Sequence, residues 1–516
     1  MKIFHNAVVY TGNGFAQAFA VDDGRFVFVG SDADAPAGDR IDLKGAFVCA
    51  GFNDSHMHLL NYGQALHMAP LSTHTGSLAE MLECLQNTAP SRGWILGRGW
   101  NQDYFSDVSR MPSRHDLDQV SRELPVCAVR ACGHALVINS KALELLGITA
   151  DTPSPDGGEI DFENGRFFDN AMDPVLNAIP APDKETLKAY LRAACTALNS
   201  RGITSCHSDD YCVFRQIPWQ TVNEAYRELE AEGLLTVRVR EQANLTTVPE
   251  LMEFIETTHQ NTPMFSMGPL KLLGDGALGA RTALLSRPYA DAPETTGLSV
   301  FTAQQFRDLI GCAHAHGMQA AIHCIGDACL DLVLDAIEAA QEAHPRPDHR
   351  HGIVHCQITR PEQLERIAQN RLHVYAQSIF LDYDIHIVRQ RVGEDLAHSS
   401  YAWKTLLNLG ATVSNGSDCP VELPDVLGGI QCAVTRQDLA GSGPYLPEEA
   451  YTLREALDSF TKAGAYASFE EHRKGQIVPG HYADFTVLGA DPFRTESAKI
   501  KDIPILETWL GGNRVW

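Results

Sequence analysis

Short runs of apolar residues alternate with longer stretches of mixed polarity over most of the chain. This rhythm predicts strands that are each followed by a helix, such as the helices expected over 303–316 and 330–343. An apolar run over 46–52 precedes the first candidate site and completes a set of eight predicted strands. The other seven cover 203–207, 235–242, 270–273, 319–323, 352–355, 372–376 and 412–415. Eight strand–helix units predict a (β/α)8 TIM-like barrel, whose chemistry sits at the carboxyl ends of the strands.

Both ends of the chain depart from this rhythm. Residues 1 to about 48 are rich in β-forming residues separated by Gly, Asn and Asp turns, and the C-terminal segments 480–488 and 505–516 have the same character. Neither end is large enough to fold alone, so we expect them to pair into one small β-sandwich. The expected domains are residues 1–48 plus 472–516 for the sandwich and 49–63 plus 185–471 for the barrel.

The stretch between His58 and the strand at 203 is too long for a plain βα connection. It contains its own predicted strands, at 94–97 and 126–130, and predicted helices. The helices are expected at 78–86, 142–146 and 184–199. We interpret residues 64–184 as an α/β insertion after barrel strand 1 that folds over the barrel mouth.

Composition narrows the class of protein. The 516 residues are 44% hydrophobic and 21% charged, as in ordinary soluble globular proteins. A formal net charge of −24 disfavours binding to nucleic acid and to anionic membranes. The 13 cysteines show no CxxC spacing, which favours reduced thiols in a cytoplasmic protein. We expect no signal peptide, and no apolar run approaches the length of a transmembrane helix.

Two histidines stand one residue apart after the first apolar run. Side chains alternate between the two faces of a strand, so His56 and His58 point the same way. Two imidazoles on one face at a strand end make half of a metal site. The spacing alone is more often that of a chance pair or a satisfied surface pair, so further ligands from downstream must decide.

Four more residues suited to a metal site fall in or at the ends of later predicted strands. They are Lys271, His323, His355 and Asp418. Each has an ordinary interpretation: the histidines as core or loop residues, Lys271 as an ion-pair partner of Asp275, and Asp418 as a turn residue ahead of Pro420. A lysine inside an apolar strand is nevertheless costly unless it is paired or chemically altered. Because barrel geometry brings strand ends together, one metal site explains all four better than separate coincidences do.

Motifs over nearly the whole chain, from about residue 46 to 490, resemble the amidohydrolase superfamily, and within it the YtcJ-like (amidohydrolase-3) branch. They read GFNDSHMH, KLLGDGALGAR, HCIGDA, VHCQ, GSDCPV and GHYADFTVL, and the insertion segments GRGWNQDYF, GHALVINSKAL and DGGEI also look like that branch. The resemblance implies a (β/α)8 barrel flanked by a β-sandwich from both chain ends. One position departs from the pattern, because Val354 stands where the branch usually has Glu. This departure puts in doubt one contact at that position, either to a metal ligand or to the substrate.

The resemblance also implies the metal ligands. His56, His58 and Asp418 would hold the more buried ion, and His323 and His355 the second. Lys271, carboxylated by CO2, would bridge both ions. Neutral imidazoles with carboxylate-like groups suit Zn²⁺, with Mn²⁺, Fe²⁺ or Co²⁺ as further candidates. A site with a single metal is an open alternative, since several members of the superfamily use one.

The activity implied is hydrolysis of a non-peptide C–N bond in a small molecule by a metal-activated hydroxide. Linear amides, N-formyl or N-acyl compounds and cyclic amides are the expected substrates, and Asp418 is the expected base and then acid. A ring-amidine deaminase is the alternative within enzymes, although Lys271 speaks against it; lactone or phosphotriester hydrolysis also stays open. From another class, the chain could be a catalytically degenerate binding or regulatory barrel. A homodimer is common in families of this type.

Weaker candidates for substrate contact come from motif-like runs near strand ends. They are Arg98, Trp100, His134, Asp275, Arg281 and Gln377. A tryptophan in the position of Trp100 is more often simply a core residue. His207 and Asp209 follow the second predicted barrel strand, where we expect them to orient a ligand histidine.

Overall fold

The computed structural model describes residues 1–516 except 132–134, 156–157, 215 and 259–260. The chain forms two compact units. The first comprises Met1–Leu59, Cys195–Val213 and Tyr226–Trp516, and the second comprises Leu60–Ala194 and Phe214–Ala225. In the described part of the chain, no helix has both the length and the apolar character that a bilayer crossing requires.

Eight strands make the central sheet of the first unit. They pair in the order β21-β20-β19-β18-β17-β16-β15-β8, and every pairing is parallel. The strands are β8 (Phe52–Met57), β15 (Ile203–Ser208), β16 (Arg238–Asn244), β17 (Phe265–Leu273), β18 (Ala320–Cys324), β19 (Gly352–His355), β20 (His373–Ala376) and β21 (Thr412–Asn415). The predicted (β/α)8 barrel is therefore confirmed.

The first and last strands meet where the candidate ligands lie. The backbone N–H of Asp418 donates to the carbonyl of His56 over 2.8 Å, and the N–H of His58 donates to the carbonyl of Cys419 over 2.8 Å. Gly416 permits this approach, because a Cβ atom there would lie 2.5 Å from the backbone nitrogen of His56. These hydrogen bonds hold His56 and His58, from the first strand, next to Asp418, which follows the last.

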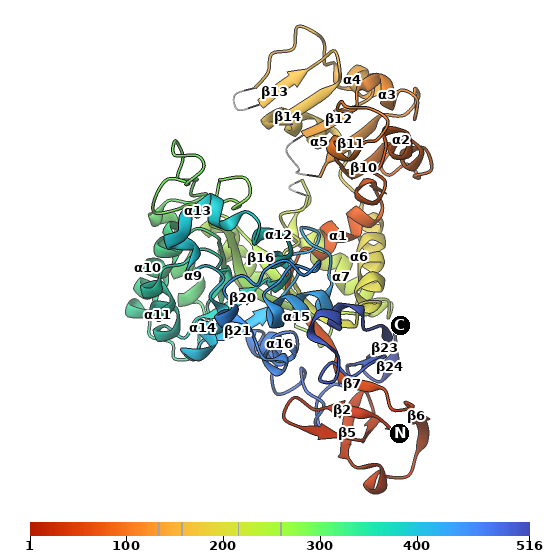
Figure 1. The fold of residues 1–516 in the computed structure, drawn as a ribbon, viewed down its shortest axis with the longest axis vertical. Coiled ribbons are helices and arrows are strands. Elements are labelled where there is room, and N and C mark those ends of the chain that lie inside the picture. Colours follow the sequence, from red (N-terminus) through yellow and green to blue (C-terminus); the bar gives the residue numbers. More distant parts are fainter. Residues whose placement is uncertain (132–134, 156–157, 215, 259–260) are drawn as a thin grey trace. The chain divides into compact units, whose positions relative to one another are not determined.

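Helices surround the barrel strands (Figure 1). The predicted helix over 303–316 is α9, which begins with a capping box between Thr302 and Gln305 and buries Phe306, Leu309 and Ile310. The predicted helix over 330–343 is α10, which starts one turn earlier, at Asp327. The α-helices here are α8 (Val248–Thr257), α9 (Ala303–Ala315), α10 (Asp327–Ala343), α11 (Pro361–Gln369), α12 (Leu381–Asp384), α13 (Val388–Ala397), α14 (Trp403–Asn408), α15 (Val426–Thr435), α16 (Leu453–Ser459) and α17 (Lys462–Ala467).

The structure corrects the prediction for the first barrel strand. The apolar run over 46–52 is divided: β7 (Phe47–Ala50) pairs with strands of the terminal sandwich, and only β8, beginning at Phe52, belongs to the barrel. Gly51 lies at the transfer, where a Cβ atom would come within 2.2 Å of the Thr204 hydroxyl. His56 therefore lies inside the barrel strand and His58 just beyond its end.

The two chain ends form two sheets, as predicted. Their shared core includes a stacked pair from the N-terminal end, Phe4 and Phe19, and one from the C-terminal end, Phe485 and Trp509, with ring centroids 4.9 and 5.5 Å apart. One sheet has the order β5-β4-β1-β6 and the other β24-β23-β22-β7-β2-β3. The strands are β1 (Lys2–His5), β2 (Val8–Tyr10), β3 (Phe15–Ala16), β4 (Ala18–Asp22), β5 (Arg25–Gly30), β6 (Asp39–Asp42), β22 (Phe485–Leu488), β23 (Ile505–Leu510) and β24 (Asn513–Arg514).

The second unit is built on a six-stranded sheet of order β13-β14-β12-β11-β10-β9. Alternate residues of β11 enter different cores, with Val126 and Ala128 on one face and Cys127 on the other, so both faces are covered. The strands are β9 (Ala69–Pro70), β10 (Ile95–Trp100), β11 (Val126–Arg130), β12 (Ala135–Ile138), β13 (Gly158–Asp161) and β14 (Arg166–Asp169). The helices are α1 (Leu59–Leu66), α2 (Leu78–Gln86), α3 (Arg114–Leu117), α4 (Ser140–Leu146) and α5 (Asp173–Ala178), and two that reach into both units, α6 (Lys184–Asn199) and α7 (Trp219–Ala231). Its placement over the barrel mouth stays a prediction.

Candidate metal centre

Three predicted ligands converge at the carboxyl end of the barrel. The Nε2 atoms of His56 and His58 lie 3.3 and 3.2 Å from the same Oδ1 of Asp418. One ligand atom from each of the three residues lies within 4.8 Å of the other two. The histidines thus share one face, as the alternation along the strand predicts.

Hydrogen bonds on the far side of each ring fix the protonation of this pair. The Nδ1 of His56 lies 2.7 Å from the side-chain oxygen of Gln242, and the Nδ1 of His58 lies 2.9 Å from the backbone carbonyl of Asp209. Both partners are acceptors, so each Nδ1 carries the proton and donates it. Each ring therefore turns Nε2, the nitrogen available to a metal ion, toward Asp418.

The other two histidines are held in the same way. The Nδ1 of His323 donates to Asp275 over 3.0 Å, and the Nδ1 of His355 donates to the side-chain oxygen of Gln377 over 2.7 Å. Gln377 in turn donates to the carbonyl of Tyr375 over 2.9 Å, which identifies its oxygen as the atom that faces His355. The His323 and His355 ring centroids are 4.5 Å apart, and those of His56 and His355 are 5.7 Å apart. All four rings are therefore contiguous, with each Nδ1 engaged by an acceptor and each Nε2 left as the atom that could bind a metal.

This arrangement fits a divalent cation. Asp418 Oδ1 has no hydrogen-bond donor among the described residues, although two imidazole nitrogens lie next to it. Lone pairs facing a carboxylate oxygen repel each other unless a cation lies among them. Burial lowers the pKa of His56, and lowers that of His355 well below its usual value, which favours the neutral form that binds metals. At His58 the effect of burial is outweighed by the Asp418 carboxylate and other neighbours, which raise its pKa well above the usual value, so without a metal this ring attracts a proton beside Asp418.

Lys271 lies in β17 with its side chain fully buried. Its Nζ is 3.6 Å from Oδ2 of Asp209 and forms no hydrogen bond with any described residue. The ion-pair alternative for this lysine therefore involves Asp209 and not Asp275, because Asp275 is engaged by His323. Carboxylation of Lys271 stays a prediction.

The comparisons with known proteins agree with this geometry. A model of the amidohydrolase family matches residues 39–516. The chain belongs to this family. It is 33% identical to the protein YtcJ of Bacillus subtilis, over 100% of this chain and 99% of that protein. The resemblance to the YtcJ-like branch is thereby confirmed.

Two further relatives of this amidohydrolase bear on its chemistry. The N-substituted formamide deformylase of Arthrobacter pascens is 26% identical over 97% of this chain and 95% of its own. The crystal structure of an uncharacterized metal-dependent hydrolase from Pyrococcus furiosus has a TM-score of 0.81 and 31% identity, covering 96% of this chain and all of that one. The family and this structural relative support a hydrolase with a metal site.

The weaker candidates of the amidohydrolase lie in varied surroundings. Arg281 makes two hydrogen bonds to Asp291, at 3.0 and 2.8 Å. Trp100 is fully buried in the core of the second unit, where its indole N–H donates to a backbone carbonyl, and this supports the core interpretation. Arg98 is exposed, and His134 lies outside the described residues. Contact of these residues with a substrate stays a prediction, as it does for Asp275 and Gln377.

Sequence reasoning missed the partner of His56. Gln242 is a fully buried polar residue near the end of β16, and a glutamine in a buried strand was the available signal. The expectation that Asp209 orients a ligand histidine is confirmed, although its backbone carbonyl does so. His207 instead packs near Tyr375 inside the barrel, with ring centroids 6.1 Å apart.

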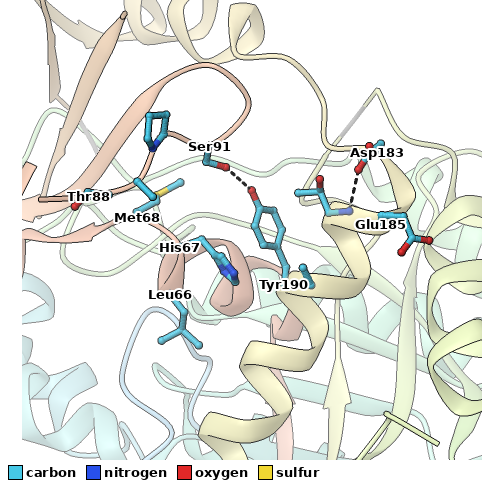
Figure 2. Close-up of a pocket in the computed structure, with 12 residues that line it drawn as sticks. Leu66, His67, Met68, Thr88, Ser91, Asp183, Glu185 and Tyr190 are labelled. Carbon is cyan, nitrogen blue, oxygen red and sulfur yellow. Dashed lines mark hydrogen bonds between the residues drawn. The ribbon is translucent and has the colours of Figure 1, made fainter. Parts of the chain in front are cut away.

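The second unit of the amidohydrolase contains a separate cavity of about 570 Å³ (Figure 2). Its polar side chains already have partners: Ser91 and Tyr190 share a hydrogen bond of 2.9 Å, and Asp183 accepts from the backbone N–H of Thr186. His67 donates to the carbonyl of Gly63 over 2.8 Å. The cavity therefore offers no converging set of ligands like that of the barrel.

Proposed function

We propose that this amidohydrolase uses a divalent metal to hydrolyse a C–N bond other than a peptide bond. The expected substrates are linear amides, N-formyl or N-acyl compounds and cyclic amides. One observation carries the proposal: every Nδ1 of the four histidines is engaged by an acceptor, which leaves Nε2 as the ligand atom of each ring, and the Nε2 atoms of His56 and His58 lie beside Asp418. The formamide deformylase relative supports the C–N class of reaction.

The residues fall into two groups of ligands. His56, His58 and Asp418 would hold one ion, and His323 and His355 would hold a second. Lys271 would join the groups once CO2 converts its amine to a carbamate, which removes a buried ammonium and supplies two oxygens. A bound divalent cation would supply Lewis acidity, polarising the substrate carbonyl and lowering the pKa of water. We expect Zn²⁺, with Mn²⁺, Fe²⁺ or Co²⁺ as alternatives, because imidazole and carboxylate suit all of them.

Asp418 is placed to move the proton in this reaction. Its carboxylate lies at the junction of β21 and β8, fixed by its own backbone N–H on the carbonyl of His56. It would take a proton from the attacking water at Oδ1 or Oδ2 and deliver it to the leaving nitrogen. This delivery matters because an amide nitrogen leaves poorly as an anion.

The burial of the ligands indicates the side from which a substrate arrives. The side chain of His56 is 1% exposed, whereas those of His58 and Asp418 are 17% and 10% exposed. His323 is 11% exposed. We therefore expect the scissile bond to approach along the edge formed by His58, Asp418 and His323, with His56 behind them.

The setting of the enzyme follows from composition. We expect it to act on a small molecule in the cytoplasm, because its cysteines show no disulfide spacing and its net charge of −24 disfavours nucleic acid. The 12 cysteines in the described part of the chain are all free, which agrees with a reducing compartment. We also expect a homodimer, as is common in such families.

Metal content per protomer, measured by plasma mass spectrometry on protein purified without chelators, is the first test. Two ions per chain together with amine release from N-formyl, N-acyl or cyclic amides would support the proposal. One ion with amine release would keep the reaction and remove the bridging role of Lys271. Release of ammonia from ring amidines alone would replace the proposal with a deaminase. An absence of metal after addition of zinc would favour a binding protein.

A further inference from the structure

A second set of metal-ligating atoms lies beside His58, on the side of β15. Asp209 directly follows this strand, and Cys212 lies three residues further on. A ligand nitrogen of His58, a carboxylate oxygen of Asp209 and the sulfur of Cys212 all lie within 4.8 Å of one another. This set shares only His58 with the set that contains His56 and Asp418.

Asp209 is held firmly in this place. It is fully buried, and its backbone N–H donates to the carbonyl of Met57 over 2.9 Å. Its Oδ2 accepts from the amide of Asn244 over 3.3 Å and lies 3.6 Å from the Nζ of Lys271. Its Oδ1 faces the Cys212 thiol, 3.5 Å away. The carboxylate therefore presents one oxygen to Lys271 and the other to the sulfur.

The chemistry of the set selects the ion. A thiolate, an imidazole nitrogen and a carboxylate oxygen together favour zinc-class divalent ions over Mg²⁺, Ca²⁺ or Mn²⁺. On binding, the S–H bond of Cys212 would break, the sulfur would keep the electron pair for the metal, and the proton would pass to solvent. The charges of aspartate and thiolate then balance those of the ion.

His58 is the residue that the two sets share. Its Nδ1 carries the proton that it donates to the carbonyl of Asp209, so Nε2 alone is free to bind. One imidazole lone pair serves one ion at a time. Occupation of one set therefore removes His58 from the other.

We propose that His58, Asp209 and Cys212 form a second cation position, which holds an incoming zinc-class ion before His56 and Asp418 take it over. Cys212 is partly exposed, whereas Asp209 and His56 are buried, so an ion from solvent would reach this set past Cys212. Transfer inward exchanges Asp209 and Cys212 for His56 and Asp418 while His58 stays bound.

The test reads the sulfur ligand directly and does not depend on hydrolysis. His56→Ala weakens the inner set and leaves the outer set complete. Loaded with Co²⁺, this variant should show a thiolate-to-cobalt charge-transfer band. Loaded with Zn²⁺, it should show a sulfur neighbour at about 2.3 Å by X-ray absorption. Both signals should disappear in His56→Ala/Cys212→Ser and persist in the control His56→Ala/Cys84→Ser, which alters a partly exposed cysteine of the second unit.

Wild-type protein provides a second reading that needs no weakened variant. When the metal-free protein is mixed with Co²⁺, the charge-transfer band should rise and then decay as the ion moves inward. Cys212→Ser should lose this transient band. The absence of sulfur from the metal shell in both experiments, or a band that survives Cys212→Ser, would overturn the proposal. The amide-hydrolysis assay decides the proposed function separately, because neither spectroscopic signal reports turnover.

Discussion

Two clusters of buried histidines occupy opposite ends of the same barrel, and they use their nitrogens differently. At the carboxyl ends of the strands, four rings engage Nδ1 with an acceptor and leave Nε2 for a ligand. At the amino ends of β18 and β19, His314, His349 and His351 form a second cluster, with the His314 and His351 ring centroids 5.0 Å apart. This difference in the use of the ring nitrogens distinguishes a cluster that can bind a ligand from one that only stabilises the fold.

Every ring nitrogen of the second cluster has a partner. The backbone N–H of Ala320 donates to Nδ1 of His351, whose Nε2 donates to Nδ1 of His314 over 2.7 Å. His314 passes its own proton to the carbonyl of His344 over 2.6 Å. His349 accepts from the backbone N–H of His351 and donates to a carbonyl over 3.0 Å. The chain of donors and acceptors is closed, so no lone pair is left for a metal.

The four histidines and Asp418 at the carboxyl ends of the strands are called the open cluster below. Replacement of Asp418 has the largest effect expected there. Asp418→Asn removes the group that accepts the proton of water, and kcat should fall by about a thousandfold while much of the metal remains. Steady-state kinetics and plasma mass spectrometry measure the two quantities. Asp425→Asn, which keeps the N-cap of α15, controls for loss of a carboxylate on the same loop. Full activity in Asp418→Asn would contradict the role of this residue.

Acid should destabilise the protein through the second cluster of His314, His349 and His351, which is called the closed cluster below. Burial lowers the pKa of His349 from 6.5 to about 4, with Arg346 lowering it further and Asp348 opposing, and burial lowers that of His351 well below 6.5. The unfolded chain therefore binds protons first, so the stability present above pH 6.5 is lost as the pH falls toward the folded pKa. The expected loss is on the order of 2 kcal/mol per fully buried histidine between pH 6.5 and about pH 5.

Urea unfolding at several pH values measures this loss, on metal-free protein so that ligand release does not contribute. His349→Leu should flatten the dependence below pH 6.5, whereas His398→Gln, at an exposed position, should leave it unchanged. A stability that is constant from pH 7 to pH 5 would show that these rings do not distinguish the folded state from the unfolded one.

The barrel and its ligand positions could be predicted from the sequence because both depend on local pattern. The strands over 352–355 and 412–415 are found with the predicted bounds. His355 ends the first of these strands, and Asp418 follows the second by three residues. Because the carboxyl ends of all barrel strands lie at the same end of the barrel, the local pattern was enough to predict that these ligands lie close together.

The partners that fix each ring could not be predicted, because they come from elements distant in sequence. Gln242 and His56 are 186 positions apart, and nothing near either residue announces the contact. The division of the first apolar run at Gly51 likewise depends on Thr204 in another strand. Val354, the departure from the branch pattern, packs with Ala321, Tyr375 and Ala467, so this position is part of the core and needs no carboxylate partner.

The smallest expected effect concerns the glutamines that hold two of the open rings. Gln242→Ala and Gln377→Ala each remove the acceptor of an Nδ1 proton, so the ring loses its fixed orientation and tautomer. Metal affinity should fall by about 10- to 100-fold in each variant, as measured by competition with a chelator. Gln319→Ala is the matched control, because Gln319 donates to the carbonyls of Arg350 and Ala467, away from the open cluster.

The control should lower the free energy of unfolding and leave metal affinity unchanged, whereas the two test variants should lower both, because each leaves a buried N–H without its acceptor. Equal affinity in Gln377→Ala and wild type would mean that the His355 ring is oriented by its packing against Phe380, whose ring lies 5.8 Å away and nearly parallel. The His355 ring would then be held in place by contacts that persist without a ligand, as the rings of the closed cluster are.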